Sequence, residues 1–169
     1  MMSICFHGDA VDWVIKLIRD GKCEGEKPTT VKDPVETVRP IDCGDINQNH
    51  GNGVYKIYPK KSKTGFQVFC DFKTDGAGWT VFHTRLNGKT DFFRGWKAYE
   101  EGFGDIQHEF WQGNRKLSQI TTQAKYELRI DMEDISEKKG YAKYTNFLVE
   151  DASMNYSSIV RDYSGDAGR

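Results

Sequence analysis

Aromatic rings and glycines alternate through residues 91–114, and no other feature of the sequence constrains the fold as strongly. The segments Asp91–Trp96, Tyr99–Gly104 and Glu109–Asn114 each place glycine close to large rings. Glycine lets the backbone pass close over an aromatic face, so the pattern is typical of short strands and shaped loops. The chain holds 4 Trp, 8 Tyr, 10 Phe and 17 Gly in 169 residues, a composition that disfavours a helical bundle.

Length and charge narrow the class of protein. A chain of 169 residues can bury one core, so we expect one domain with a tail. The 24 basic residues are balanced by 25 acidic ones, which offers no basic surface for a nucleic acid. No apolar run approaches the roughly 20 residues that a membrane span needs. The first residues also lack the basic and apolar regions of a secretory signal.

Residues 9–20 show a helical period. The apolar positions at i, i+3, i+4 and i+7 are Val11, Val14, Ile15 and Ile18. This spacing predicts a short amphipathic helix within an N-terminal segment, 1–23. Such a helix needs a partner for its apolar stripe, either a second copy of the chain or the main domain. Cys5 and Cys23 flank it, so we expect one of them to help join chains into a homo-oligomer through an interchain disulfide.

A linker and a mixed domain follow the N-terminal segment. Residues 24–40 contain three of the four prolines among charged residues, which predicts a stiffened, solvated linker. Residues 41–169 alternate short runs of β-forming residues with turns, which predicts an α+β domain with a largely antiparallel sheet and short helices. The predicted strands are 54–58, 66–70, 79–85, 126–132, 141–150 and 156–160, and the predicted helices are 96–101 and 114–120.

The sequence offers no set of catalytic or metal-binding residues. Its three Gly-x-Gly triplets do not continue into a nucleotide-binding motif, and we interpret them as turns. The four histidines are scattered, and His108 lacks the second histidine that a zinc hydrolase motif needs. Cys70 and His83 have no third residue to orient them as a catalytic dyad. We therefore predict that the protein is not an enzyme, has no catalytic residue and binds no metal.

Two groups of residues each allow more than one interpretation. Cys43 and Cys70 lie at the ends of a predicted two-strand unit, where they form either a disulfide or two buried thiols. Trp79, Trp96 and Trp111 are either core residues or an aromatic platform for carbohydrate. The core is favoured, because large rings are rarely exposed in such numbers.

A modification signal lies near the C-terminus. Asn155-Tyr156-Ser157 is the one N-glycosylation sequon of the sequence. It is informative only if the protein enters the secretory route. Asn155 is therefore a candidate glycosylation site whose use depends on localisation.

The stretch from Cys43 to Gly168 closely resembles the fibrinogen C-terminal domain, which occurs in fibrinogen chains, ficolins, angiopoietins, tenascins and invertebrate fibrinogen-related lectins. The resemblance runs in order through ten blocks of sequence. These are Asp42–Cys43, Gly53–Pro59, Phe66–Asp71, Thr74–Val81, Phe92–Trp96, Tyr99–Gly104, Glu109–Asn114, Tyr126–Arg129, Tyr141–Phe147 and Tyr163–Gly168.

The resemblance implies an extracellular, non-enzymatic recognition domain in which Cys43 and Cys70 form the family's first disulfide. The family's calcium loop, second cysteine pair and ligand pocket all follow the last matching block, and this chain stops at Arg169. No calcium ligand, cofactor or pocket residue is therefore carried over, and we expect an incomplete domain. Ala77 stands where the family usually has glycine, which predicts strain in a turn that needs a positive φ.

These observations lead to three functional hypotheses. We expect a secreted, lectin-like protein of innate defence whose full-length form binds glycans or acetylated groups. The alternative is a matrix or receptor-ligand protein of the angiopoietin or tenascin type, which binds a cell-surface receptor. The third is an incomplete fragment without binding activity.

Overall fold

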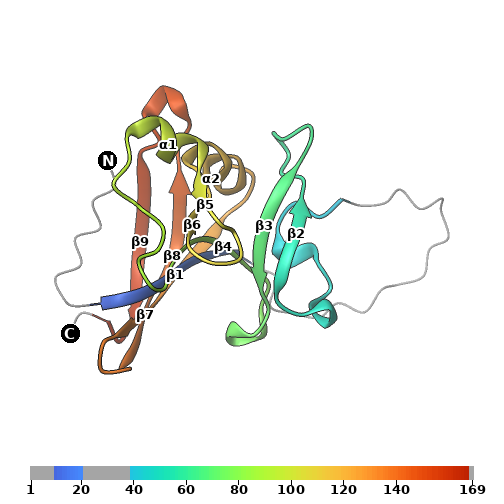
Figure 1. The fold of residues 1–169 in the computed structure, drawn as a ribbon. Helices are drawn as coiled ribbons and strands as arrows, with labels where there is room; N and C mark the ends of the chain where they lie inside the picture. Colours follow the sequence, from blue (N-terminus) through green and yellow to red (C-terminus); the bar gives the residue numbers. More distant parts are fainter. Residues whose placement is uncertain (1–9, 21–38, 168–169) are drawn as a thin grey trace.

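The computed structural model describes residues 10–20 and 39–167. These residues form a strongly twisted antiparallel sheet with two short helices packed at one end (Figure 1). The strands are β1 (Ala10–Arg19), β2 (Gly53–Ile57), β3 (Phe66–Asp71), β4 (Trp79–Arg85), β5 (Phe103–Gly104), β6 (Phe110–Trp111), β7 (Tyr126–Asp134), β8 (Lys139–Val149) and β9 (Ser158–Gly165). The predicted α+β class is confirmed.

The strand order across the sheet is β2-β3-β4-β1-β7-β8-β9, and the short strands β5 and β6 extend it beside β4. The helices are α1 (Trp96–Glu101) and α2 (Asn114–Thr121), both close to their predicted bounds. Four 3-10 turns complete the elements: η1 (Cys43–Asp45), η2 (Gln48–His50), η3 (Thr74–Gly76) and η4 (Ala152–Met154).

The predicted N-terminal helix is wrong. Residues 10–19 form β1, which pairs antiparallel with β4 on one side and with β7 on the other. Its residues are rich in Val and Ile, and a strand between two neighbours satisfies both edges of its backbone while burying both faces. Ile15, Leu17 and Ile18 are all buried in this position. The remaining residues of the predicted 1–23 segment lie outside the described part of the chain, apart from Asp20.

Lys16 interrupts the apolar pattern of β1 and is itself buried, with 2% of its surface exposed. Its Nζ lies 2.9 Å from Asp71 Oδ2 and 2.7 Å from Asp131 Oδ2, and it donates to Thr74 Oγ1 at 2.7 Å. Burial alone would raise the pKa of Asp71, but hydrogen bonds from Thr74 and Lys16 lower it well below its ordinary value. Lys16 thus ties β1 to Asp71 at the end of β3 and to Asp131 on β7.

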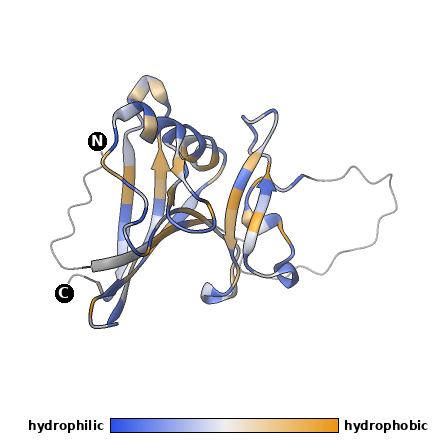
Figure 2. Cartoon of the chain, in the orientation of Figure 1, coloured by the Kyte–Doolittle hydropathy of each residue, from blue (hydrophilic) through white to orange (hydrophobic). Residues whose placement is uncertain are grey.

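One core connects β1 to the other elements. It contains Ile15, Leu17, Val68, Leu128 and Phe147, from strands on both sides of β1. Figure 2 shows hydrophobic residues along β3 and hydrophilic ones in the turn that joins β2 to β3. Strand β1 therefore belongs to the same sheet as the strands predicted between residues 41 and 169, and most of the predicted linker lies outside the described residues.

Candidate recognition groove

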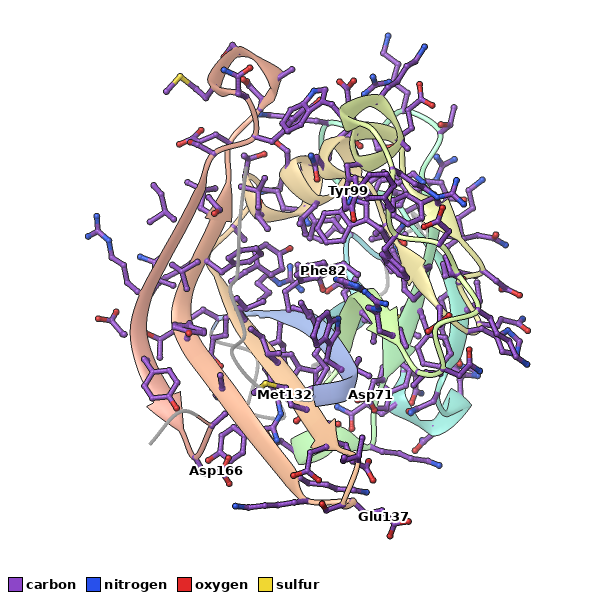
Figure 3. The ribbon with its side chains drawn as sticks, turned by 60° about the vertical axis from the view of Figure 1, so that its left-hand side comes forward. Asp71, Phe82, Tyr99, Met132, Glu137 and Asp166 are labelled. Carbon is purple, nitrogen blue, oxygen red and sulfur yellow. A yellow bond between two sulfur atoms is a disulfide. The ribbon has the colours of Figure 1, made fainter. Side chains whose placement is uncertain are left out.

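A hollow with a volume of about 500 Å³ opens on the helical side of the sheet, and we call it the aromatic groove. Its partly buried lining residues include Trp13, His83, Arg85, Phe92, Tyr99 and Trp111. Tyr99 lies among several aromatic side chains on this side of the molecule, above Phe82 (Figure 3). Because the lining comes from β1, β4, β6, α1 and the loop before α1, the groove exists only in the folded protein.

His83 lies at the centre of this ring cluster. Trp13 Nε1 donates to His83 Nε2 at 3.3 Å, and the imidazole stacks on Phe92 with ring centroids 5.2 Å apart. Burial and the positive charge of Arg85 lower the pKa of His83 to about 4. The imidazole is therefore neutral near pH 7, which leaves Nε2 able to accept the hydrogen bond from Trp13.

Backbone carbonyls hold two further rings in place. Tyr99 Oη donates to the carbonyl of Phe92 at 2.9 Å, and Trp111 Nε1 donates to the carbonyl of Tyr99 at 2.8 Å. Burial raises the pKa of the Tyr99 phenol, so the hydroxyl keeps its proton. With both polar atoms bonded to the protein, the rings present their apolar faces in fixed positions.

Two arginines of the groove lining lie over aromatic rings. The Arg85 guanidinium lies 4.7 Å from the Phe92 centroid and 5.6 Å from the Trp13 centroid. The Arg94 guanidinium lies 4.8 Å from the Phe103 centroid, and its Nε donates to the carbonyl of Asp91 at 2.8 Å. Stacking occupies the face of a guanidinium and leaves N–H groups at its edge.

The loop that leads into the groove is held by one buried carboxylate, Glu109, which is 2% exposed. Its Oε1 accepts from the backbone N–H groups of Leu86, Asn87 and Gly88, and its Oε2 accepts from Thr90, at 2.7–2.9 Å. Burial alone would raise the pKa of Glu109, but these four donors lower it to about 2. Glu109 thus fixes the loop that runs from Arg85 to Phe92.

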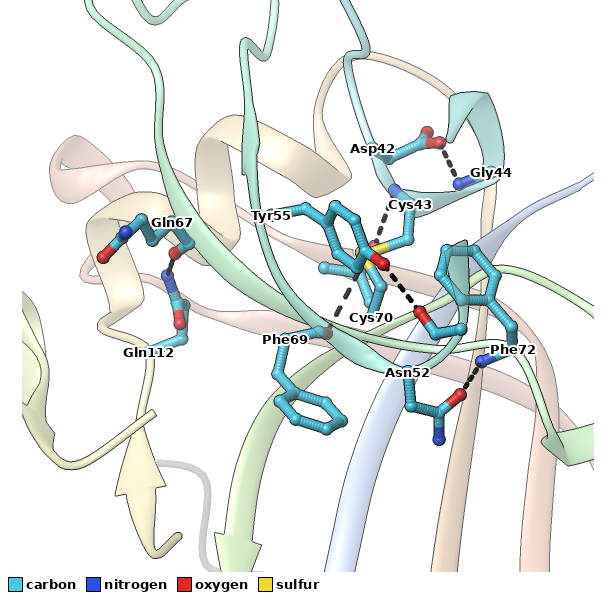
Figure 4. The surroundings of a disulfide bond; sticks show 12 residues. Asp42, Cys43, Gly44, Asn52, Tyr55, Gln67, Phe69, Cys70, Phe72 and Gln112 are labelled. Atoms are coloured by element: carbon cyan, nitrogen blue, oxygen red, sulfur yellow. Dashed lines mark hydrogen bonds between the residues drawn. A yellow bond between two sulfur atoms is a disulfide. The ribbon is translucent and has the colours of Figure 1, made fainter. Parts of the chain in front are cut away.

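Cys43 of η1 and Cys70 of β3 form a disulfide, with Cα atoms 5.6 Å apart (Figure 4). The pairing implied by the family resemblance is therefore present in the structure. Beside it, Asp42 accepts from Gly44 N at 2.9 Å and from Tyr126 Oη at 2.8 Å. This cluster ties the first turn of the domain to β7 and lies away from the groove lining.

The three tryptophans have different environments. Trp79 is 1% exposed and belongs to the core, Trp111 is partly buried in the groove, and Trp96 is 47% exposed. The core interpretation is therefore wrong for Trp96, because α1 places this ring at the groove opening, 6.2 Å from the Tyr156 ring. Phe93, in the preceding loop, is 98% exposed.

The other predicted site residues lie in different parts of the molecule. Asn155 is exposed, has a φ of 51°, and lines the groove next to Tyr156. Cys5 and Cys23 lie outside the described residues. Cys70 is in a disulfide, so a Cys70–His83 dyad is excluded. Ala77 has a φ of −117°, so the expected strain is absent, because Asp75 and Gly76 carry the positive φ values of this turn.

Among residues 10–20 and 39–167, no group of three or more His, Cys, Asp or Glu side chains is placed to hold a metal ion. None of the helices in this part of the protein has the length and apolar character needed to span a membrane.

The groove itself was not predicted from the sequence. The ring-rich stretch 91–114 supplies part of its lining, but the helix predicted for residues 9–20 does not pair Trp13 with His83, which lies 70 residues further along the chain. The sequence signal for the exposure of Phe93 and Trp96 is their immediate context, because both rings lie among polar and glycine residues.

Comparison with protein families gives one match over most of the chain. Residues 39–169 match the family described as "Fibrinogen beta and gamma chains, C-terminal globular domain". The mouse fibrinogen C domain-containing protein 1 is 46% identical over 128 residues, which are 73% of this chain and 28% of that protein. Mouse tenascin is 48% identical over 132 residues, which are 76% of this chain and 6% of tenascin. The chain thus spans less than a third of these curated relatives.

Solved structures give the same match. The fibrinogen-like globe domain of human ANGPTL2 is 36% identical, with a TM-score of 0.74 over 76% of this chain and 61% of that chain. Lamprey fibrin D-dimer, complexed with the peptide ligand Gly-His-Arg-Pro-amide, is 36% identical with a TM-score of 0.72 over 88% of this chain and 48% of that chain. Strand β1 precedes the residues that the family model matches.

Proposed function

Because this protein belongs to the family of C-terminal globular domains of fibrinogen beta and gamma chains, we propose that it is a secreted, lectin-like recognition module that binds glycans or acetylated groups in innate defence. Domains of this family are binding modules and not enzymes. In this protein, the aromatic groove would be the surface that contacts the ligand.

The observation that carries the proposal is the set of exposed and half-buried rings at the groove opening. Trp96 and Phe93 are exposed, and Tyr156 lies beside Trp96. The apolar face of a sugar ring stacks on such rings, and an acetyl methyl group fits against them for the same reason. The Tyr156 hydroxyl donates to Glu100 at 2.8 Å, which holds this ring in position.

The test compares acetylated with non-acetylated ligands. We expect the purified protein to bind N-acetylglucosamine resin more tightly than glucose resin. A Trp96→Ala variant removes a stacking ring and should weaken this binding about tenfold. Ile135→Ala is the matched control, because Ile135 is 73% exposed on the β7–β8 turn and does not line the groove. Equal retention on both resins would contradict the proposal.

A second candidate is a receptor-ligand or matrix protein, for which a cell-surface receptor would occupy the same surface. It is supported by the similarity to the fibrinogen-like globe domain of human ANGPTL2 and to lamprey fibrin D-dimer, whose ligand is a short peptide. A competition experiment distinguishes the two candidates. Free N-acetylated sugar should displace a glycan ligand from the protein. A receptor that stays bound in the presence of that sugar would favour the second candidate.

Two modifications follow from a secreted location. Asn155 is exposed, so we propose that it carries an N-glycan, which glycosidase treatment would detect as a loss of mass in the wild-type protein and not in Asn155→Gln. Homo-oligomers joined through Cys5 or Cys23 remain a prediction. Electrophoresis with and without reductant, together with alkylation of free thiols, tests it.

A further inference from the structure

Asn155, the asparagine of the sequon, lies in the lining of the aromatic groove. It is exposed, and its side-chain amide forms no hydrogen bond with residues 10–20 or 39–167. Ser157, which completes the sequon, is also exposed. A glycan on Asn155 therefore breaks no hydrogen bond among the described residues, and it begins inside the groove lining.

The turn that carries Asn155 is held by hydrogen bonds on both sides. The Asp151 side chain accepts from Ser153 N at 2.9 Å, and the Asp151 carbonyl accepts from Tyr156 N at 3.0 Å. The Tyr156 hydroxyl donates to Glu100 of α1 at 2.8 Å. These contacts fix the first sugar of a glycan on Asn155 relative to α1.

Exposed rings of the groove lie next to this attachment point. Trp96 is 47% exposed, and its centroid is 6.2 Å from the ring of Tyr156, the residue that follows Asn155. Phe93, which is 98% exposed, lines the same groove. An N-glycan begins with N-acetylglucosamine, whose sugar ring has an apolar face and whose acetyl group ends in a methyl. These are the two groups that stack on exposed aromatic rings.

We infer that a glycan on Asn155 occupies the aromatic groove of its own chain and competes there with external ligands. This inference rests on the proposed function, because it takes the groove to bind N-acetylated sugars, and it adds a form of regulation. The occupant is thus the core of the protein's own glycan, and the attachment point in the lining is the reason for choosing it.

Tethering makes this competition effective. A group on a short flexible connection has an effective concentration of about 1 mM or more at a neighbouring site. A single sugar offers few atoms for contact, so its dissociation constant is also about 1 mM. The two quantities are similar, and the tethered glycan therefore fills much of the groove. We expect it to weaken the binding of a free sugar about two- to tenfold.

The experiment compares full-length proteins that differ in where the glycan is attached. The chain is secreted from cultured animal cells, and mass spectrometry locates each glycan. Ser157→Ala removes the sequon and leaves Asn155 in the lining. Adding Asp134→Asn to it creates a sequon with Ser136 at the β7–β8 turn, outside the groove lining. The amide introduced at this position keeps an oxygen for the N–H groups of Ser136 and Lys138. This double variant is the matched control.

Two measurements are made on each protein. Titration with N-acetylglucosamine, followed by NMR, should show that Ser157→Ala and the double variant bind about two- to tenfold more tightly than the glycosylated wild type. Trp96 is the most exposed of the four tryptophans, so quenching of tryptophan fluorescence by acrylamide reports mainly on this ring. Quenching should be weaker in the wild type than in both variants. Thermal unfolding checks that the variants keep the fold.

The outcomes separate the inference from the proposed function. The inference is overturned, with sugar binding left in place, if Asn155 carries no glycan, if all three proteins bind the sugar equally, or if quenching of Trp96 is the same in all of them. A double variant that binds as weakly as the wild type also overturns it, because a glycan outside the groove then has the same effect. If neither variant binds N-acetylglucosamine, the proposed function fails and the inference fails with it.

Discussion

Replacing Glu109 by glutamine should loosen the loop that leads into the aromatic groove. The change keeps the size of the side chain but removes its charge and turns one acceptor oxygen into a donor. If the remaining oxygen stays with Leu86, Asn87 and Gly88, Thr90 N–H loses its acceptor. The protein then keeps three weaker bonds and one buried, unsatisfied donor.

The expected magnitude follows from the individual bonds. Hydrogen bonds to a charged group contribute about 1.5–3 kcal/mol each, against about 1 kcal/mol for neutral ones, and an unsatisfied buried donor costs about 1–3 kcal/mol. We therefore expect Glu109→Gln to lower the free energy of unfolding by about 3–5 kcal/mol. That is a large fraction of the stability of a typical domain, which is about 5–15 kcal/mol.

Urea unfolding at several pH values provides the assay, and its pH dependence separates charge from packing. The pKa of Glu109 is about 2 in the folded protein, below its ordinary value of 4.5, so the unfolded protein takes up the proton first as the pH falls. The stabilisation by Glu109 is thus complete above about pH 4.5 and is lost on the way down to pH 2. The difference between wild type and Glu109→Gln should shrink over this window.

Glu101→Gln serves as the control, because Glu101 is an exposed glutamate at the end of α1. It should leave the free energy of unfolding within about 0.5 kcal/mol of wild type. The reasoning is refuted if Glu109→Gln is as stable as Glu101→Gln at pH 7, or if its deficit is the same at pH 6 and pH 2.

Three further predictions concern β1, the groove and the disulfide. Lys16→Ala should lower the free energy of unfolding by about 3–5 kcal/mol in urea titrations, because it leaves Asp71 without its buried cation; stability equal to wild type would contradict the ion pair. The pKa of His83 is about 4 in the folded protein against 6.5 ordinarily, so the unfolded protein binds the proton more readily and stability should fall between pH 6.5 and 4. His83→Gln should flatten that part of the thermal-unfolding profile, and an unchanged slope would count against it. Replacing Cys43 and Cys70 together by alanine should cost about 2–4 kcal/mol, measured against the oxidised wild type; a reduced wild-type protein as stable as the oxidised one would refute this.

Strands such as β3 and β7 could be predicted from the sequence because their burial follows the period of two that a half-buried strand imposes. Residues 126–132 alternate apolar and charged side chains, and β7 buries Tyr126, Leu128 and Ile130 accordingly. The strand 79–85 has the predicted bounds, and both short helices lie within one residue of theirs. In these segments, the secondary structure that the local sequence favours is also the one that packing in the folded protein requires.

Strand β1 could not be predicted because both of its faces are buried. In a short run such as Trp13–Ile18, apolar residues satisfy a helical period and a two-sided strand equally well. The segment forms a strand because it pairs with the edges of β4 and β7, and both of these strands are far away in the sequence. The predicted strain at Ala77 was wrong for a related reason, since the neighbouring residues Asp75 and Gly76 adopt the positive φ instead.

The position of β1 matters for function because this strand supplies one wall of the aromatic groove. Trp13 bonds to His83 and stacks under Arg85, while Lys16 fixes the same strand to Asp71 and Asp131. The family model begins at residue 39, so this wall lies outside the residues that define the family. A change in β1 therefore alters the ring that supports Arg85 without altering any family-matched residue. It follows that the ligand preference of this groove has to be measured on a protein that contains residues 10–19, and cannot be transferred from relatives that match only from residue 39 onward.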